Sequence, residues 1–454
     1  MATLRVAVVG AGPAGIYASD ILLKEAEGTH EVSIDLFDRL PAPYGLVRYG
    51  VAPDHPRIKG VVNGLREVLD TGRIRIFGNV DFGTDLTLDD LRSRYHAVIF
   101  ATGASRDAHL DIPGIEAEGS FGAADFVHWY DAHPDHPRDW PLDSESVAVI
   151  GNGNVALDVA RMLAKHPDDL MPTEIPANVE AGLRASKVTD VHVFGRRGPL
   201  QVKFTPLELR ELGEVPDVDV IIDEADFDRD PEADAESLKN KQRLVINRIF
   251  GQWRERANEP RTASRRLHLH FWAKPSEVLT DENGRVRALR VERNNPNGDG
   301  GVMGSGEFTS VPLGQISRAG GYLGSPLDEV PFDETRGVIP NEGGVVIDAA
   351  GEKVPGLYAT GWIKRGPVGL IGHTKSDAKE TIANLLGGPE HWWQPADTDT
   401  ESIVKLLAER NVPVTDLDGW HRLDAHERQL GEAAGRERIK VVDRDEMTRI
   451  SRGE

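Results

Sequence analysis

The sequence contains no cysteine at any of its 454 positions. A chain without thiols forms no disulfide, no thiolate metal site, no Cys-ligated iron–sulfur cluster and no Cys-x-x-Cys redox pair. Long apolar runs are also missing, since none approaches the roughly 18 residues that a membrane-spanning helix needs. Neither the phosphate-binding pattern G-x-x-x-x-G-K-[ST] nor the nucleophile pattern G-x-S-x-G occurs. Any redox chemistry of this chain must therefore use a bound organic cofactor.

The net charge is −21, which disfavours non-specific binding to nucleic acid. Charged residues make up 28% and the apolar set 39% of the chain, as is ordinary for a globular protein. The start shows no basic-then-apolar leader, so we expect a cytoplasmic protein without a membrane span. A length of 454 residues is enough for two domains and for about three.

The first recognisable motif runs from Arg5 to Asp38. An apolar run, Val6–Val9, is followed by the glycine-rich segment Gly10–Gly15, a helical pattern, and a second apolar run that ends at Asp38. This order predicts strand, tight turn, helix and strand, which is the context that a dinucleotide-binding fingerprint requires. The alternative is a glycine turn in some other α/β protein.

Each glycine of this motif has a physical role. Gly10 permits the tight turn, Gly12 lets backbone approach a pyrophosphate, and Gly15 lets the helix lie close to the strand. The helix N-terminus offers N–H groups and positive dipole charge to the phosphates. Asp38 can accept hydrogen bonds from a ribose, and its negative charge disfavours a 2′-phosphate. The motif therefore predicts FAD or another unphosphorylated adenosine cofactor.

A second motif of the same kind begins at Ser146. An apolar strand is followed by Gly151-Asn152-Gly153 and a helical pattern, which matches the accepted variant G-x-G-x-x-A. The next apolar strand is followed by Arg196 and Arg197, in the place that Asp38 occupies in the first motif. Two arginines suit a dianionic 2′-phosphate and predict NADP. A solvated arginine pair on a loop is the alternative.

The first nucleotide fold is predicted to be split in sequence. Two apolar strands end in Ala-Thr-Gly, at 101–103 and 359–361, and a helix is expected from about Thr374 to Leu386. We therefore predict an α/β protein with two Rossmann-like dinucleotide-binding domains, the NADP domain inserted into the FAD domain. The expected bounds are 1–106 and 327–388 for the FAD-binding domain, 107–326 for the NADP-binding domain, and 389–454 for a C-terminal helical appendage on the FAD domain.

The remaining signals are weaker. Residues 40–59 form a loop rich in proline and glycine that contains His55 and lies where the flat end of a cofactor is expected. The segment Lys239–Arg266 is basic, with a solvated helix face as the alternative to a binding surface. His268 and His270 share a strand face, but two ligands without a third or an acid do not make a site, so we expect no metal.

Four segments together resemble the adrenodoxin reductase family of ferredoxin–NADP reductases, including its bacterial members. They are PAPYGLVRYGVAPDHPRIK at 41–59, GNGNVALDVAR at 151–161, GRRGPLQ at 195–201 and GWIKRGPVGLIG at 361–372. The resemblance covers roughly residues 3–388. It implies a flavoenzyme that passes electrons from NADPH through FAD to a ferredoxin-type iron–sulfur protein, which brings the cluster that a cysteine-free chain cannot hold.

The resemblance also implies the functional residues. His55 and Glu211 match residues that this family places near the junction of flavin and nicotinamide, and they are the catalytic candidates. The residues implied for FAD are Gly10, Gly12, Pro13, Gly15, Asp38, Leu46, Asp81, Trp362, Gly369, Leu370 and Ile371. The residues implied for NADP are Asn152, Gly153, Asn154, Val155, Arg196, Arg197, Glu208 and Gly369.

The sequence departs from the family pattern at three places. Tyr44 stands where the family usually has tryptophan, and Ala108 stands where an arginine can occur, with Arg106 the nearest one. The segment Gly320-Gly321-Tyr322 replaces the usual S-x-G-Y. The last two differences concern the hinge contacts of the NADP domain, and none touches the arginine pair.

Ferredoxins are acidic as a class, so docking to a chain of charge −21 needs a local basic face near the flavin edge. The candidates are Arg210, the run Lys239–Arg248, and Lys364-Arg365. Two other functions stay open. One is a different NADPH-dependent flavin oxidoreductase, such as a monooxygenase or a glutamate-synthase-like electron-input subunit, although the latter normally has cluster cysteines. The other is a non-catalytic flavin-binding protein. The presence of two nucleotide folds, one with an acidic residue and one with two arginines at the nucleotide-binding position, argues against it.

Overall fold

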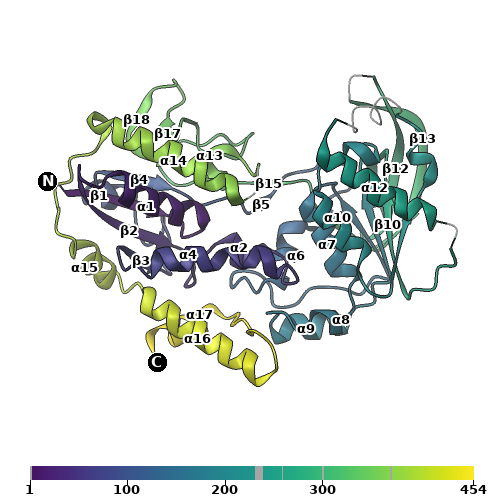
Figure 1. Cartoon of the computed structure of the whole chain (residues 1–454), viewed down its shortest axis with the longest axis horizontal. Helices are drawn as coiled ribbons and strands as arrows, with labels where there is room; N and C mark the ends of the chain where they lie inside the picture. The colour runs from purple at the N-terminus through teal and green to yellow at the C-terminus, as the bar shows by residue number, and fades with distance from the viewer. Residues whose placement is uncertain (1–2, 231–238, 258, 299–300, 369–370) are drawn as a thin grey trace. The chain divides into compact units, whose positions relative to one another are not determined.

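The computed structural model describes residues 3–230, 239–257, 259–298, 301–368 and 371–454 (Figure 1). The chain divides into two compact units. The first contains Met1–Arg106, Asp131–Asp135 and Tyr322–Glu454, and the second contains Asp107–Tyr130 and His136–Gly321. Residues 131–135 and 322–326 therefore cluster with the first unit, whereas the sequence placed them in the second domain.

The first unit is built on a seven-stranded sheet of order β16-β17-β18-β4-β1-β2-β3. The strands from β18 to β3 run parallel, and β16 and β17 are added antiparallel at one edge. The carboxyl ends of β1, β2 and β4 meet in register, with Val9 paired to both Phe37 and Phe100. The strands are β1 Thr3–Val9, β2 Glu31–Asp38, β3 Ile74–Gly78, β4 Ala97–Phe100, β16 Asn341–Glu342, β17 Val345–Ile347 and β18 Lys353–Ala359.

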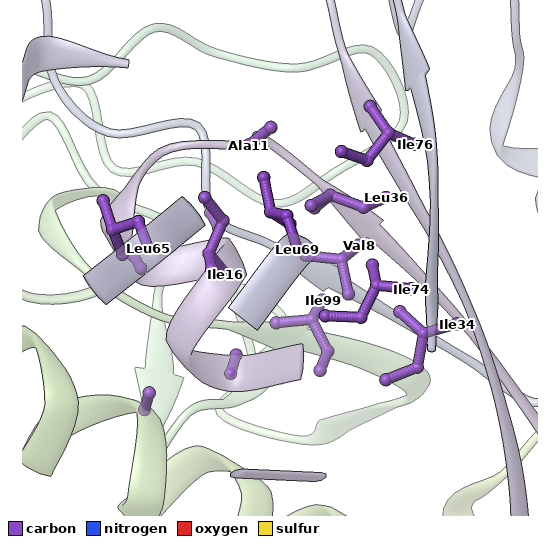
Figure 2. Close-up of a cluster of buried hydrophobic side chains, with 14 of the residues drawn as sticks. Val8, Ala11, Ile16, Ile34, Leu36, Leu65, Leu69, Ile74, Ile76 and Ile99 are labelled. Atoms are coloured by element: carbon purple, nitrogen blue, oxygen red, sulfur yellow. The ribbon is translucent and has the colours of Figure 1, made fainter. Parts of the chain in front are cut away.

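Apolar side chains on both faces of this sheet are buried, as expected for parallel strands. In β1, Val6 and Val8 join the core under helix α1 (Pro13–Glu25), while Ala7 and Val9 join the core of the opposite face. Figure 2 shows the first of these cores, where Val8 and Ile16 lie among side chains from the neighbouring strands and helices. Helix α14 (Ile371–Gly387) packs beside α1. The helix after the second Ala-Thr-Gly thus completes the same unit as the first glycine turn.

The second unit repeats the plan with a six-stranded parallel sheet of order β6-β14-β7-β8-β10-β9. A three-stranded antiparallel sheet, β11-β12-β13, packs over one face of it through Phe194, Val278 and Leu289. The strands are β6 Ser120–Gly122, β7 Ser146–Ile150, β8 Asp190–Phe194, β9 Val218–Ile222, β10 Arg265–His270, β11 Ala273–Thr280, β12 Val286–Pro296, β13 Val302–Pro312 and β14 Gln315–Arg318. Its main helices are α6 Ala123–Tyr130, α7 Asn154–Ala164, α8 Pro167–Leu170, α9 Ala177–Arg184, α10 Pro206–Gly213 and α12 Lys241–Glu255.

Short helices and the C-terminal residues complete the first unit. Two helices follow the proline-rich loop, α3 (Pro56–Lys59) and α4 (Val61–Leu69), with Gly60 between them. The other helices are α2 Leu46–Tyr49, α5 Leu88–Arg92, α13 Trp362–Arg365, α15 Ser402–Glu409, α16 Leu417–Ala433 and α17 Arg444–Arg452. Short 3₁₀ turns occur at Pro199–Gln201, Glu224–Asp226 and Pro389–His391, and short strands β5 and β15 at Arg106–Asp107 and Tyr322–Leu323. Across the described ranges, every helix is too short or too polar to cross a bilayer.

Candidate nucleotide-binding sites

The first glycine turn has a backbone that only glycine fits. Gly10 has φ +113°, and a Cβ added there would lie 2.4 Å from the carbonyl oxygen of Ala101. A Cβ on Gly15 would lie 1.9 Å from the carbonyl oxygen of Gly10, so the helix packs directly on the turn. On Gly12 a Cβ would meet only the Cα of Gly45, at 3.8 Å. The turn therefore packs tightly against the sheet at Gly10 and Gly15, whereas no side chain projects from its outer side at Gly12.

Asp38 lies at the end of β2 and braces this turn. Its Oδ2 accepts the N–H of Ala11 at 2.7 Å, and its Oδ1 accepts the N–H of Leu40 at 2.9 Å. Burial raises the pKa of Asp38, and the two N–H groups together with Arg39 and Arg444 oppose that rise. Each carboxylate oxygen keeps a second lone pair, so the same group can accept a ribose hydroxyl.

These residues fit the adenosine and pyrophosphate of FAD. The first turn of α1 leaves N–H groups without intrahelical partners, and Gly12 is its N-cap with Pro13 at the first helical position. Leu46 begins α2, and Trp362 begins α13 after Gly361, which has φ +77°. Asp81 follows β3, and burial raises its pKa. Gly369 and Leu370 lie outside the described residues, and Ile371 is the first residue of α14.

The second glycine turn reproduces the geometry of the first. Gly151 has φ +155°, and a Cβ there would lie 2.3 Å from the carbonyl oxygen of Ala319. Its N–H bonds the carbonyl of Phe194, as the N–H of Gly10 bonds that of Phe37. Gly153 is the N-cap of α7, which starts at Asn154 and Val155. The N-terminus of α7 is thus the counterpart of the N-terminus of α1.

Arg196 and Arg197 follow β8, beside this second turn. Their carbonyls are fixed, because Asn294 donates its side-chain N–H to Arg196 and Trp272 donates its backbone N–H to Arg197. Arg196 is exposed, whereas Nε of Arg197 is buried and has no hydrogen-bond partner within the described part of the chain. A buried guanidinium N–H costs free energy until it meets an acceptor. A phosphate is the acceptor that a pair of arginines fits best.

Glu208 acts on the second turn through Asn154. The carboxylate is buried, accepts the side-chain N–H of Asn154 at 3.2 Å, and is also hydrogen-bonded by the hydroxyl of Thr205. The side-chain oxygen of Asn154 in turn accepts the N–H of Thr205 at 2.9 Å. This network fixes Asn154 at the first position of α7. Sequence resemblance placed Glu208 at the nucleotide; its described bonds orient a residue of the turn.

Three histidines of the second unit come together, because β8 adds His192 to the pair His268 and His270. The ring of His268 stacks on that of His192, with centroids 4.2 Å apart and planes at 11°. Ring lone pairs lie in the ring plane, so stacked rings do not aim them at one metal ion. Nδ1 of His192 lies 3.0 Å from Nε2 of His270, and burial lowers their pKa values to about 4 and about 3. His192 and His270 are thus hydrogen-bonded to each other, while His268 stacks on His192 and bonds Asp190.

Comparison with known proteins identifies the family. The family model described as pyridine nucleotide-disulphide oxidoreductase matches residues 4–193. NADPH-ferredoxin reductase FprA of Mycobacterium tuberculosis is 39% identical over 99% of each chain. Mitochondrial NADPH:adrenodoxin oxidoreductase of Bos taurus is also 39% identical, over 99% of this chain and 92% of that one. This chain belongs to the adrenodoxin reductase-type family of ferredoxin–NADP reductases.

The solved structures of the family confirm the fold class. The structure of Mycobacterium tuberculosis FprA in complex with NADPH superimposes with a TM-score of 0.89 at 37% identity, over 99% of this chain and 100% of that one. A second FprA structure, which revealed a covalent modification of NADP+, gives a TM-score of 0.90 at 38% identity, with the same coverage. The α/β architecture with one nucleotide-binding domain inserted into another is therefore shared with these family members.

The two catalytic candidates of this family member lie in different units. His55 belongs to the first unit; it is 4% exposed, and its carbonyl accepts the N–H groups of Ile58 and Lys59 at the start of α3. Glu211 belongs to the second unit, on α10, and its Oε2 lies 3.9 Å from the Arg161 guanidinium.

The basic candidates fare differently. Lys364 was predicted as part of a docking face, and this is wrong: the residue is 7% exposed and its Nζ lies 3.0 Å from Asp377 and 2.6 Å from Glu380. The Lys364 ammonium is therefore neutralised inside the first unit. Arg210 on α10 and Arg248 on α12 are exposed, and these two helices pack against each other.

Sequence reasoning missed a buried contact behind the first turn. Arg48, which follows the predicted flavin-binding residue Leu46, bonds Glu427 of the C-terminal helix α16. The two residues are separated by 379 positions, and α16 carries no chemical motif. The only local signal was an arginine inside an otherwise apolar turn.

Proposed function

We propose that this chain is an FAD-dependent ferredoxin–NADP(+) reductase, which passes electrons from NADPH to a ferredoxin-type iron–sulfur protein. The observation that carries the proposal is a pair of similar glycine turns with residues of opposite charge beside them, Asp38 at the first and Arg196 with Arg197 at the second. The activities named for FprA and for adrenodoxin oxidoreductase support it. When bound, FAD supplies the chemistry, because a flavin takes up an electron pair and releases single electrons.

Three measurements test this function: the visible spectrum, bleaching by NADPH, and cytochrome c reduction with and without ferredoxin. We expect a yellow protein with about one FAD per chain, rapid bleaching, and cytochrome c reduction that depends on ferredoxin. A folded, colourless protein that cannot be reconstituted with FAD would contradict the proposal. Bleaching without any response to ferredoxin would favour another NADPH-dependent flavin oxidoreductase.

At the FAD site, the chain holds the cofactor mainly through backbone. The N-terminus of α1 at Gly12 and Pro13 binds the pyrophosphate, and Asp38 accepts a ribose hydroxyl. Close packing at Gly10 and Gly15 keeps this N-terminus at the sheet edge. The remaining proposed contacts are Leu46, Asp81, Trp362 and the segment Gly369–Ile371.

At the NADP site, the N-terminus of α7 binds the pyrophosphate through the segment from Asn152 to Val155. Glu208 keeps Asn154 in place for this contact. Arg196 and Arg197 bind the 2′-phosphate through charge-assisted hydrogen bonds. Gly369 is also proposed to bind NADP.

His55 and Glu211 are the proposed residues at the junction of flavin and nicotinamide. His55 is buried among loop residues rich in proline, and a histidine there can hold or move a proton near neutral pH. A His55→Gln variant should be reduced by NADPH several-fold more slowly than the wild type, with FAD retained. Stopped-flow reduction between about pH 6 and about pH 8 measures this. An unchanged rate across that range would leave His55 with the role of bracing its loop.

The proposed docking face for ferredoxin consists of Arg210 on α10 together with Lys239, Lys241, Arg243 and Arg248 at α12. Lys241 and Arg248 are seven residues apart and exposed, so they share the face of α12 opposite to the buried Ile246. Salt screens the charges that lie more than about 8–10 Å from the docking partner. A local basic patch can therefore act despite the net charge of −21. Complementary charge then raises the association rate and sets the orientation.

Charge reversal tests this docking face. Lys239, Lys241 and Arg243 changed to glutamate should lower kcat/KM for ferredoxin about tenfold at low ionic strength, because steering is lost. Ferredoxin-dependent turnover of the wild type should fall steeply with salt, whereas reduction of small neutral acceptors by NADPH should fall much less.

The matched control reverses the charges of Lys379 and Lys405, which are 69% and 68% exposed in the first unit. This control should keep wild-type kinetics with ferredoxin. If the triple variant also keeps the wild-type rate and salt slope, the partner binds elsewhere. We also propose that the protein lies in the cytoplasm, which cell fractionation with an antibody tests.

A further inference from the structure

The C-terminal residues of the first unit pack behind the turn Tyr44–Tyr49, which contains Leu46. Trp420 on α16 is 3% exposed, Glu427 on the same helix is 0% exposed, and Lys440 in the segment after α16 is 3% exposed. Two of these three side chains carry a charge. A buried charge is stable only with a partner. Glu427 pairs with Arg48 of this turn and with Arg438, and Lys440 pairs with Asp131 and donates to the carbonyl oxygen of Arg48.

Glu427 holds the turn through a two-fold contact with Arg48. Oε2 of Glu427 accepts a hydrogen bond from Nη1 of Arg48 at 3.0 Å, and Oε1 accepts one from Nη2 at 2.5 Å. The side chain of Arg48 is 4% exposed and that of Glu427 is 0% exposed. This is the forked geometry in which arginine binds a carboxylate most strongly. Oε1 also accepts the N–H of Val441 at 3.0 Å, which ties the segment after α16 to the same carboxylate.

Lys440 holds the backbone of the same turn. Its Nζ donates to the carbonyl oxygen of Arg48 at 2.6 Å, and to the carbonyl and carboxylate oxygens of Asp131 at 3.1 Å and 3.3 Å. The side chain of Lys440 is 1% exposed and that of Asp131 is 0% exposed. Arg48 is thus fixed at its guanidinium by Glu427 and at its carbonyl by Lys440.

The opposite side of this turn meets the first glycine turn. Tyr44 donates its N–H to the carbonyl of Ala11 at 2.8 Å, and Gly45 lies against Gly12. The Tyr44 ring is 2% exposed and packs edge-on against Trp420, with centroids 5.6 Å apart. Tyr44 has φ +84°, a left-handed backbone that is disfavoured for residues other than glycine and needs support from its surroundings.

We propose that Glu427 and Lys440 are positioning residues for FAD, which hold the Tyr44–Tyr49 turn against the glycine turn that binds the cofactor. The inference rests on the assignment of FAD to that glycine turn. Neutralising Glu427 leaves the Arg48 guanidinium buried beside an amide, and the turn then moves to hydrate the charge. Because Tyr44 and Gly45 move with the turn, Ala11 and Gly12 lose their packing and the protein releases FAD faster.

The test uses the holoprotein with Glu427→Gln, which keeps the shape of the side chain. The fluorescence rise on dilution reports the release of FAD, and we expect release at least about tenfold faster than from the wild type, the effect of one charge-assisted contact. Affinity for 2′,5′-ADP, a probe of the second unit, should not change.

Asp424→Asn is the matched control. Asp424 lies on the same helix and is 7% exposed, and its carboxylate lies 2.7 Å from Arg438 and 3.0 Å from Arg428. Arg438 also lies 3.3 Å from Glu427, so this variant disturbs the same charge cluster and leaves the contact between Glu427 and Arg48 in place. This variant should lose some thermal stability and release FAD at the wild-type rate. Lys440→Met, the second variant, should accelerate FAD release as Glu427→Gln does, and it replaces that variant if Glu427→Gln does not fold.

Two outcomes decide the matter. If Glu427→Gln or Lys440→Met lowers the thermal stability as Asp424→Asn does and FAD release stays at the wild-type rate, the contact stabilises the fold only and the proposal is overturned. A coupling between Arg48→Met and Glu427→Met, with the double variant releasing FAD more slowly than either single variant, supports it. A wild-type protein that binds no FAD would instead defeat the cofactor assignment, so the two failures are distinguishable.

Discussion

A Gly10→Ala variant should purify without FAD, whereas the wild type purifies yellow. The added Cβ would lie 2.4 Å from the carbonyl oxygen of Ala101, and the backbone at φ +113° disfavours any side chain. Because the clash is with backbone directly after the neighbouring strand β4, the turn itself must move away from the sheet edge. The ratio of flavin absorbance to protein absorbance measures the loss, which we expect to exceed about tenfold, since backbone strain alone costs about 1–3 kcal/mol.

A Gly28→Ala control separates the effect of backbone strain from the effect of the steric clash. Gly28 belongs to the same strand–helix–strand segment and has φ +81°, yet a Cβ there would meet nothing within 4 Å. Gly28→Ala should therefore cost about 1–2 kcal/mol of stability and keep its FAD. Equal flavin content in Gly10→Ala and wild type would show that the first turn does not hold the cofactor.

A substitution in the second glycine turn should impair only the second nucleotide site. Gly151→Ala places a Cβ 2.3 Å from the carbonyl oxygen of Ala319. We expect this variant to stay yellow and to lose binding of NADPH, as seen by titration of the flavin spectrum. Loss of both cofactors in either glycine variant would indicate general unfolding.

Replacing Arg196 and Arg197 with glutamine should shift the preference from NADPH towards NADH. A charge-assisted hydrogen bond contributes about 1.5–3 kcal/mol, so the double variant should raise KM for NADPH at least tenfold, and about a hundredfold if both contacts contribute. KM for NADH should change little, because NADH has no 2′-phosphate. Steady-state reduction of ferricyanide with each nucleotide measures both values.

Arg184→Gln is the control for a lost surface charge in the same unit. Arg184 is 47% exposed and already pairs with Glu180 and Asp168, so its replacement should leave both KM values unchanged. Equal losses with NADPH and NADH in the double variant would mean that the arginine pair binds a part common to the two nucleotides.

Both glycine turns could be predicted because their signals are local. The glycines, Asp38 and the arginine pair each lie within a single strand–turn–helix–strand segment, whose geometry is decided by sterics at Gly10 and Gly151. The apolar alternation in β1 places Val6 and Val8 on one face and Ala7 and Val9 on the other, and parallel register brings the strand ends to one edge. Such sequence patterns reflect interactions between residues that are a few positions apart.

The prediction for Lys364 failed for the opposite reason. Next to Arg365 in the sequence it appeared as surface charge, but α13 directs it to α14, where Asp377 and Glu380 neutralise it. Those acids follow 13 and 16 residues later, on another helix. Whether a lysine is a surface charge or a buried partner depends on that packing, which its neighbours in sequence do not reveal.

The sequence was sufficient to predict the two nucleotide folds, their order and the charged residues beside each glycine turn, because all of these follow from backbone sterics and charge within a few residues. The sequence also predicted that residues 389–454 lie on the FAD-binding domain, but it did not predict which of their side chains meet the turn at Arg48, because that depends on the tertiary structure. Glu427 and Lys440 reach Arg48 across more than 370 positions of sequence. A buried charge must find its partner wherever folding brings one, and that partner can lie at any distance along the chain.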